Sequence, residues 1–207
     1  MKDYIELSKN HFNNQAKIYD ETNTAYYSKY PKISCKDVAQ RLNNIQYQSL
    51  LDIGCGTGYL IDLLQKQKSA LYCGLDLSPE MLKVARKKLP ESVFLSEGSS
   101  DCLPYEDNSF DIVTCIQSFH HYPDPEKAMK EAYRVLKNDG LYILSDTGYG
   151  GVPKWFYNNF ILKVANTGDY AVYSMKDIEN LMIKSGFAIN DAQKIDRFVY
   201  TIVAVKR

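Results

Sequence analysis

The sequence predicts an α/β protein built around a parallel sheet, and three observations lead to this fold class. From residue 49 onward, an apolar run, a glycine-containing or polar turn and a segment of helical period follow one another several times. Two of the helical segments open with a capping residue followed by proline. The stretch "LDIGCGTGYL", residues 51–60, places three glycines at alternate positions directly after an apolar run.

Five strands are expected in this repeating part of the chain. The first, 49–54, is a buried apolar run, and the helix after it carries Leu60, Ile61, Leu63 and Leu64 on one face. The later runs alternate with helical segments, which is the order of β-α units. They span residues 70–77, 92–98, 110–118 and 141–146.

The helix after the second strand has a clear start. Ser78 is suited to cap it, and Pro79 stands at its first helical position, where a missing N–H costs nothing. This start places Asp76 and Leu77 at the carboxyl edge of the second strand.

The remaining elements follow from the same signals. "DP" at 124–125 repeats the cap-plus-proline start, and the helix that it opens, with Leu136 on its inward face, stops at "NDG", 138–140. The segment 174–187 is an amphipathic helix closed by a glycine, and two β-prone runs, 188–195 and 198–206, suit a terminal hairpin.

Residues 1–207 are expected to form a single domain with two additions. The polar, tyrosine-containing first 45 residues suit helices that cover the core, so 1–45 is predicted as an N-terminal helical cover. Residues 147–173 are too long for a plain connection and form a substrate-side insertion. Its aromatic residues Trp155, Phe156 and Tyr157 either pack the insertion itself or enclose a substrate.

Composition and charge exclude several classes of function. Lys plus Arg and Asp plus Glu are both 25, so no global field attracts a nucleic acid, and no segment has the roughly 20 apolar residues that span a bilayer. The N-terminus lacks the apolar centre of a secretion signal, which indicates a cytoplasmic protein. Five cysteines without a C-x-x-C pair indicate reduced thiols and no zinc site. The oligomeric state is left open.

The glycine turn indicates a ligand that approaches the main chain. In an open α/β sheet, ligands bind at the carboxyl ends of the strands, and the first β-α turn supplies backbone N–H groups for an anionic group. Gly54, Gly56 and Gly58 lie on that turn, in a G-C-G-T-G spacing that differs from the G-x-G-x-x-G of dinucleotide loops. Asp76 can accept bonds from both hydroxyls of a ribose, each worth about 1.5–3 kcal/mol. Together these residues suit a nucleoside that carries an anionic group.

Several motifs in order resemble a known family. "LDIGCGTG", "LDLSPEML", "LPYEDNSFDIV", "QSFHHYPDPEKAMKEAYRVLKNDG" and "SGF" are similar to class I S-adenosylmethionine-dependent methyltransferases, in the branch of the ubiquinone/menaquinone-biosynthesis (methyltransferase type 11) enzymes. The resemblance covers residues 45–145, then the terminal helix and hairpin. It implies a Rossmann-like three-layer sandwich with a seven-stranded, mostly parallel sheet of order 3-2-1-4-5-7-6, strand seven antiparallel. It also implies S-adenosyl-L-methionine as the cofactor and S-adenosyl-L-homocysteine as its product.

The resemblance also implies roles for individual residues. The glycine turn, with Cys55 inside it, would hold the methionine part of the cofactor, Asp52 would support its amino end, and Asp76 would hold the ribose. The residues expected to flank the adenine and ribose, or to lie over the cofactor, are Leu77, Met81 and Tyr19.

One position departs from the family pattern. Ser99 and Ser100 stand where the family often has Asp followed by Ala, the Asp accepting from the adenine amino group. A serine hydroxyl can offer only a neutral hydrogen bond there, so a weaker contribution to cofactor affinity is expected.

Methyl transfer from a sulfonium is an in-line displacement, so positioning is the main catalyst, worth about 7–11 kcal/mol of such a barrier. The end of the fourth strand, from Gln117 onward, is predicted to face the methyl group, with His120 or His121 as a possible general base. Packing and backbone hydrogen bonding are the alternative roles for these histidines. No Cys, Asp or Glu stands at ligand spacing beside them, so no metal is expected.

The composition, the motifs and the resemblance are compatible with three functions. The first is a methyltransferase acting on a small molecule, favoured by the neutral charge and the aromatic insertion. The second is a non-catalytic protein that binds S-adenosylmethionine, whose binding motifs would look the same. The third, an NAD(P)-dependent oxidoreductase, is disfavoured by the glycine spacing and the terminal hairpin.

Overall fold

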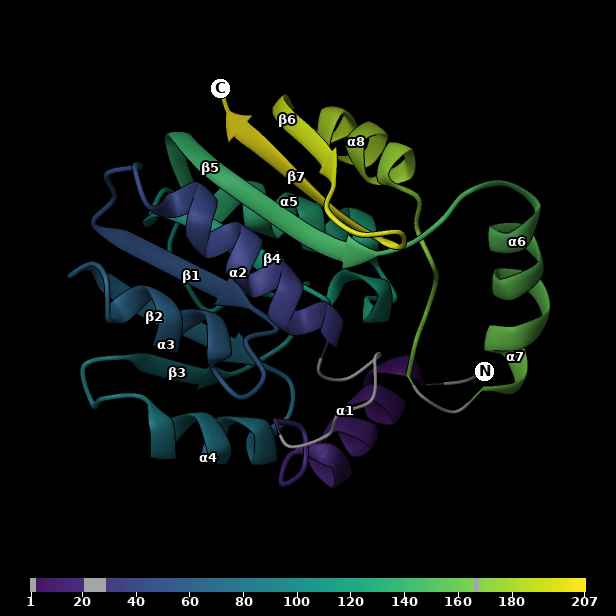
Figure 1. Ribbon diagram of the computed structural model, residues 1–207, viewed down its shortest axis with the longest axis horizontal. Coiled ribbons are helices and arrows are strands. Elements are labelled where there is room, and N and C mark those ends of the chain that lie inside the picture. The colour runs from purple at the N-terminus through teal and green to yellow at the C-terminus, as the bar shows by residue number, and fades with distance from the viewer. Residues whose placement is uncertain (1–2, 21–28, 166–167) are drawn as a thin grey trace.

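A seven-stranded sheet forms the centre of the protein in a computed structural model that describes residues 3–20, 29–165 and 168–207 (Figure 1). The strand order is β3-β2-β1-β4-β5-β7-β6, as the resemblance implies. The strands are β1 (Ser49–Ile53), β2 (Leu71–Asp76), β3 (Phe94–Glu97), β4 (Phe110–Ile116), β5 (Leu136–Thr147), β6 (Phe187–Lys194) and β7 (Val199–Lys206).

The strand directions bring the functional residues to one edge of the sheet. β1 pairs in parallel with β2 and β4, β2 with β3, and β4 with β5, whereas β7 is antiparallel to both of its neighbours. Asp52 on β1 lies opposite Gly74 on β2 and Thr114 on β4. The carboxyl ends of β1, β2 and β4 therefore meet at one edge, where open α/β sheets bind ligands.

Helices cover both faces of the sheet (Figure 1). They are α1 (Tyr4–Gln15), α2 (Tyr30–Leu42), α3 (Tyr59–Gln65), α4 (Pro79–Lys88), α5 (Pro125–Val135) and α8 (Met175–Lys184), with the short turns η2 (Phe119–His121), α6 (Gly151–Phe156), η3 (Tyr157–Ile161) and α7 (Leu162–Val164). The predicted caps are confirmed: the side chains of Ser78 and Asp124 accept from the backbone of Met81 and Lys127.

Two apolar layers hold the helices to the sheet. On one face, Met129 of α5 and Met182 of α8 pack with sheet residues such as Leu144, all fully buried. On the other face, Val38 of α2 and Ile61 of α3 are equally buried. Burying one such side chain stabilises the fold by about 1.5–3 kcal/mol, so both layers fix the sheet that carries the edge residues.

The boundaries of several elements differ from the prediction. The α5 helix ends at Val135, and Leu136, expected on that helix, instead begins β5 and pairs with Phe110. The expected start at residue 141 is therefore wrong by five residues, because Asp139 in the "NDG" stretch takes a left-handed φ of 60° within an irregular strand. The third strand, expected over 92–98, is confined to Phe94–Glu97.

The N-terminal addition contains helices, as expected, and the insertion contains short helices that the sequence did not predict. The N-terminal cover, 1–45, contains α1 and α2, and the insertion, 147–173, contains α6, η3 and α7. Residues 1–2, 21–28 and 166–167 of these two segments lie outside the described residues. Figure 1 shows α1 at the carboxyl edge of the sheet and α6 with α7 standing away from it. The boundaries of the cover, the insertion and the single domain stay predictions.

All five cysteines carry free thiols, as the sequence indicates; Cys102 is exposed and the others are buried. Among the described residues, none of the helices combines the length and the apolar character that crossing a bilayer requires.

Candidate active site

The glycine turn between β1 and α3 borders the cavity at the carboxyl edge of the sheet. The backbone N–H groups of Gly54 and Cys55 donate to the carbonyl of Leu75, at 2.7 and 3.0 Å, which ties the turn to β2. All three glycines have left-handed φ, between 53° and 75°. That conformation favours glycine, and it explains the residue type at these positions.

The space around each glycine differs. A Cβ added at Gly56, which lines the cavity, would meet nothing within 4 Å, so a ligand can approach the main chain there. A Cβ at Gly54 would collide with Ser118, and one at Gly58 would lie 2.6 Å from Leu89 Cδ1. Gly58 is not among the cavity residues. Of the three expected ligand contacts, Gly54 and Gly56 line the cavity, while Gly58 permits the packing of α3 against α4.

Asp52 lies at the end of β1 with its side chain buried and its carboxylate at the cavity wall. Its Oδ1 accepts a hydrogen bond of 2.7 Å from the Thr114 hydroxyl. Burial raises the pKa of Asp52 to about 7, assisted by the charge of Asp76 and opposed by the Thr114 bond. A buried carboxylate of this kind is stabilised by a cationic partner.

Asp76 ends β2 on the other side of the turn. Its two carboxylate oxygens accept from the backbone N–H of Gly56 at 2.7 Å and of Ser78 at 2.8 Å. Burial raises the pKa of Asp76 to about 6, and the backbone hydrogen bonds oppose that shift. Two buried carboxylates therefore flank one glycine turn and face one cavity.

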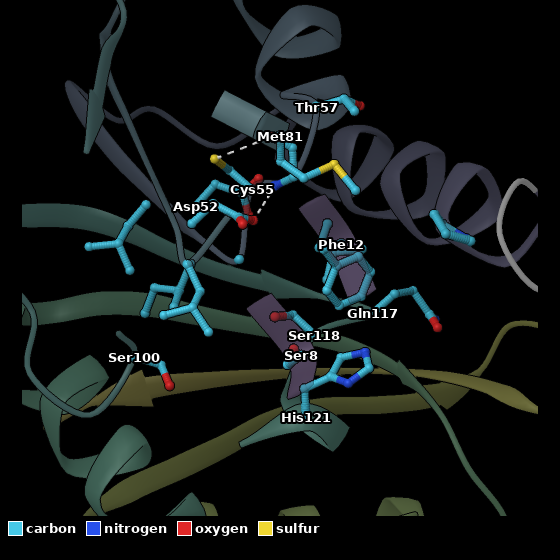
Figure 2. A pocket seen from close by; sticks show the side chains of 18 of the residues that line it. Ser8, Phe12, Asp52, Cys55, Thr57, Met81, Ser100, Gln117, Ser118 and His121 are labelled. Atoms are coloured by element: carbon cyan, nitrogen blue, oxygen red, sulfur yellow. Dashed lines mark hydrogen bonds between the residues drawn. The ribbon is translucent and has the colours of Figure 1, made fainter. Parts of the chain in front are cut away.

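The other expected cofactor residues complete the wall of the cavity. In Figure 2, Asp52, Cys55 and Met81 lie on one side of it, and Ser118 and His121 lie on the opposite side. The expected residues that line it, besides those already placed, are Tyr19, Leu77, Ser99, Ser100 and Gln117. The fold thus brings together every predicted cofactor residue except Gly58.

Gln117 has an unusual backbone. Its φ is 49°, a left-handed value that is uncommon for a residue with a side chain. The N–H of Gln117 donates to the carbonyl of Ser145 at 2.8 Å, and its side-chain amide donates to Ser34 Oγ at 3.0 Å. These contacts with β5 and α2 hold the strained residue at the cavity wall, where such strain commonly marks a functional position.

The N-terminal helix α1 covers the cavity, and sequence reasoning did not identify its contributions. Ser8 and Phe12 line the cavity, and Asn13 accepts a 2.7 Å hydrogen bond from the Ser78 hydroxyl. Just beyond α1, Asp20 accepts from Thr57 in the glycine turn at 2.8 Å. No local sequence motif marks these residues. Only the polar, tyrosine-containing composition of the first 45 residues predicted that this segment covers the core.

The two predicted catalytic histidines have different environments. His121 lines the cavity, and its ring meets that of Phe12 edge-on at 5.0 Å. His120 is buried behind it, with Nδ1 2.6 Å from Asp146 Oδ1. Burial lowers the pKa of His120, but the negative charges of Asp146 and Asp169 outweigh this and raise it to about 9. Burial and the neighbouring His120 lower the pKa of His121.

The prediction that no metal binds at the two histidines was based only on residues close to them along the chain. The fold brings in a carboxylate from far away: Asp169 Oδ1 lies 3.7 Å from His120 Nε2 and 3.3 Å from His121 Nδ1. Asp146 was also missed, although it is the last acidic residue of the predicted fifth strand and so stands at the same sheet edge.

The predicted substrate residues lie elsewhere. Trp155 and Phe156 are on α6, 58% and 51% exposed, and neither they nor Tyr157 line the cavity. Figure 1 shows α6 standing away from the sheet edge. The structure does not bring the aromatic residues of the insertion into the site.

Comparisons with known proteins show what this chain resembles. The family described as "Methyltransferase domain" matches residues 51–144. The demethylmenaquinone methyltransferase of Chlorobaculum tepidum is 38% identical over 54% of this chain and 46% of its own length, and that of Lactobacillus johnsonii is 38% identical over 60% and 58%. The matched part thus corresponds to about half the length of these relatives.

A solved structure shows the same fold over the whole chain. The complex between the Trm112 methyltransferase activator and a methyltransferase of Haloferax volcanii contains a chain that superposes with a TM-score of 0.81 at 19% identity, covering 96% of both chains. The superposition and the shared sheet order show the class I methyltransferase fold. Residues 51–144, which include the glycine turn, match the methyltransferase-domain family, and the chain is similar in sequence to methyltransferases of the menaquinone-biosynthesis type.

Proposed function

We propose that this protein transfers a methyl group from S-adenosylmethionine to a small-molecule acceptor. The observation that carries the proposal is the pair of buried carboxylates, Asp52 and Asp76, on either side of a glycine turn that faces one cavity. S-adenosylmethionine has a cationic amino group near its carboxylate and a ribose with two hydroxyls. These groups match the charge and hydrogen-bonding capacity of the turn and its two flanking carboxylates.

The carboxylates are proposed to act on different parts of the cofactor. Asp52, with one oxygen held by Thr114, would stabilise the amino group, and that cation would in turn compensate the burial that raises the pKa of Asp52. Asp76 is oriented by the N–H groups of Gly56 and Ser78 and would accept from the ribose hydroxyls. Ser99 and Ser100 would border the adenine with neutral groups.

The lining of the cavity supports an acceptor that binds beside the cofactor. Small-molecule sites are mostly apolar, with a few polar groups that orient the ligand. Apolar residues Ile5, Phe12 and Pro123 border it together with His121. The equal numbers of acidic and basic residues favour a small acceptor over a nucleic acid.

When bound, S-adenosylmethionine supplies an electrophilic methyl group, and the leaving sulfur takes the electrons of the broken C–S bond to give S-adenosylhomocysteine. The protein's part is to hold the acceptor in line behind the methyl carbon and to exclude water, which is worth about 7–11 kcal/mol of the barrier. The α1 helix, which covers the cavity through Phe12 and Asn13, is proposed to provide that exclusion.

Of the two histidines predicted as a possible base, only His121 lines the cavity. A general base contributes about 10²–10⁴ in rate where the acceptor must lose a proton. Acceptors that react without losing a proton need no such group.

Calorimetry followed by a transfer assay tests the proposal. The purified chain is titrated with S-adenosylhomocysteine and, separately, with NAD⁺; micromolar binding of the first and none of the second is expected. Radiolabelled S-adenosylmethionine is then incubated with a panel of small quinol, phenol, amine and thiol acceptors, and label in an extracted product is expected. Binding of NAD⁺ alone would favour an oxidoreductase, and cofactor binding without transfer to any acceptor would favour the non-catalytic alternative.

A further inference from the structure

Two of the three histidines of the protein, His120 and His121, lie around one carboxylate, that of Asp169. Asp169 Oδ1 is 3.7 Å from His120 Nε2 and 3.3 Å from His121 Nδ1, and its charge also acts on the pKa of His11. The potential ligand atoms of His120, His121 and Asp169 lie within 4.8 Å of one another. In a neutral chain with so few histidines, this concentration at one point calls for a physical explanation.

We propose that His120, His121 and Asp169 bind one divalent transition-metal ion of the zinc class. A tetrahedral ion with bonds of about 2.0–2.2 Å holds its ligand atoms roughly 3.3–3.5 Å apart. Asp169 Oδ1 lies 3.3 Å from His121 Nδ1 and 3.7 Å from His120 Nε2, close to that spacing. Two imidazole nitrogens and one carboxylate are donors suited to Zn²⁺ and neighbouring transition metals, whereas Mg²⁺ and Ca²⁺ prefer oxygen ligands alone.

The orientation of His120 supports this assignment. Asp146 Oδ1 lies 2.6 Å from His120 Nδ1, and Asp146 Oδ2 accepts a 3.1 Å hydrogen bond from the His120 backbone N–H. This double contact fixes the ring and directs Nε2 toward Asp169. A carboxylate that binds the remote ring nitrogen is the usual support of a metal-binding histidine, because it sets the tautomer and strengthens the ligand.

His121 supplies an independent observation. Its side chain is only 10% exposed, and its Nδ1 is buried without a hydrogen-bond partner among residues 3–20, 29–165 and 168–207. The same atom faces Asp169 at 3.3 Å. Buried polar atoms are rarely left without a partner in native proteins, and an ion at this position would coordinate it.

The chain around the cluster holds Asp169 in place. Gly168 has a φ of 82°, and a Cβ there would lie 2.5 Å from Ser8 Cα, so this glycine allows the segment to contact α1 closely. The backbone N–H groups of Tyr170 and Ala171 both donate to the carbonyl of His120, at 2.8 and 3.1 Å. The segment that carries Asp169 is therefore held on one side against α1 and on the other by hydrogen bonds to His120, one of the other proposed ligands.

Charge favours a cation at the same point. Asp146 and Asp169 are 1% and 8% exposed, so two carboxylates are buried within one small cluster. Buried carboxylates are compensated by cationic partners or metal ions. Without a metal, a protonated His120 between the two carboxylates offsets one of their charges, and a bound ion would displace that proton. A divalent ion would supply two positive charges at the position that both imidazoles and Asp169 share.

The site borders on the proposed acceptor space, because His121 also lines the cavity. Three protein ligands leave a fourth position for another ligand. Coordination through Nδ1 would exclude the general-base role of His121, because the other ring nitrogen of a metal-bound neutral imidazole carries a hydrogen. The metal site does not depend on the proposed methyl transfer, since ion binding and cofactor binding are measured separately.

Metal titration of the full chain tests the site. Protein stripped with a chelator is dialysed against Zn²⁺ and, separately, Mg²⁺, and bound metal is counted by mass spectrometry. One Zn²⁺ and no Mg²⁺ per chain is expected. The Co²⁺-loaded protein is expected to show the intense visible bands of a four- or five-coordinate ion and contact-shifted N–H proton signals from two imidazoles. These signals identify the ligands in the wild-type protein, without relying on variants that could fail to fold.

Variants then assign the site. H121Q and D169N are expected to weaken Zn²⁺ binding at least 100-fold, and D146N about 10- to 100-fold as expected for a supporting carboxylate. C102S, which removes the exposed thiol, is the matched control and should bind as the wild type does. Absence of a stoichiometric ion, a thiolate band in the Co²⁺ spectrum, or undiminished binding in folded H121Q and D169N would overturn the proposal. Titration of the chelator-treated protein with S-adenosylhomocysteine tests the cofactor site separately.

Discussion

Asp76 accepts a 2.7 Å hydrogen bond from the backbone N–H of Gly56, so the carboxylate at the end of β2 and the glycine turn after β1 form one unit. Asp76 is thereby oriented before any ligand arrives, with its remaining lone pairs available at the cavity wall. Preorganisation of this kind reduces the entropy lost when a ligand binds.

The D76A variant should bind S-adenosylhomocysteine weakly. Loss of the proposed ribose contacts is expected to cost about 1.5–3 kcal/mol, or roughly 10- to 100-fold in Kd. Calorimetry measures the change, and D107N, which alters an exposed carboxylate, serves as the control. Unchanged affinity in a folded D76A protein would refute the ribose role.

Cofactor affinity should depend on pH through Asp52. Because burial raises the pKa of Asp52 to about 7, its carboxyl group is largely protonated below that pH and cannot stabilise a cationic amino group well. The Kd for S-adenosylhomocysteine is expected to fall as pH rises from 6 to 8. In D52N the affinity should be lower and this dependence much flatter; an equally steep profile in D52N would assign the dependence to another group.

Asp52 should also make the stability of the ligand-free protein depend on pH. The direction is opposite to that of cofactor affinity: stability should fall as pH rises. A raised pKa means that the folded state binds the proton more tightly than the unfolded state, so the contribution of Asp52 is present below about pH 4 and is lost as pH rises through about 7. Without ligand, D52N should therefore raise Tm relative to the wild type at pH 8, with a smaller difference at pH 5. Thermal unfolding at the two pH values tests this, and a larger gain at pH 5 would contradict it.

Alanine substitutions at Gly56 and Gly58 should affect cofactor affinity and protein stability to different extents. A side chain at Gly58 meets Leu89 in addition to the left-handed backbone strain, so G58A is expected to lose about 2–5 kcal/mol of stability, the sum of the two effects. G56A bears only the strain, about 1–2 kcal/mol, but places a methyl group at the cavity wall. G56A should lose more cofactor affinity, and G58A more stability, in denaturant titrations and calorimetry. The reverse order would reject this division of roles.

The S99D variant should gain affinity. A carboxylate accepts a hydrogen bond from an amino group about 1 kcal/mol more strongly than a hydroxyl does, which corresponds to roughly fivefold in Kd. Competition with S-adenosylmethionine measures the gain, and S109D, on the far side of the fold from the cavity residues, provides a matched control. No gain in S99D would indicate that the adenine does not lie beside Ser99.

Most of the fold could be predicted because the relevant signals are local. The caps at Ser78 and Asp124, the apolar runs and the glycine spacing each act within a few residues, and the family resemblance supplied the strand order that periodicity cannot. The limits of β5 could not be predicted, because the pairing of Leu136 with Phe110 depends on a neighbouring strand. The aromatic residues of the insertion could be recognised in the sequence. Whether they line the cavity could not be predicted, because this also depends on contacts with distant segments.

By itself, the sequence determined the residues that lie next to a strand end: the glycine turn, Asp76 and the two histidines follow from local pattern, and the family resemblance adds Asp52. Only the tertiary structure decided which of them face the cavity, how α1 closes it, and that Asp146 and Asp169 join the histidines. Short-range backbone preferences specify the first kind of information. Contacts between distant segments, which form only when the sheet and its covering helices pack together, specify the second.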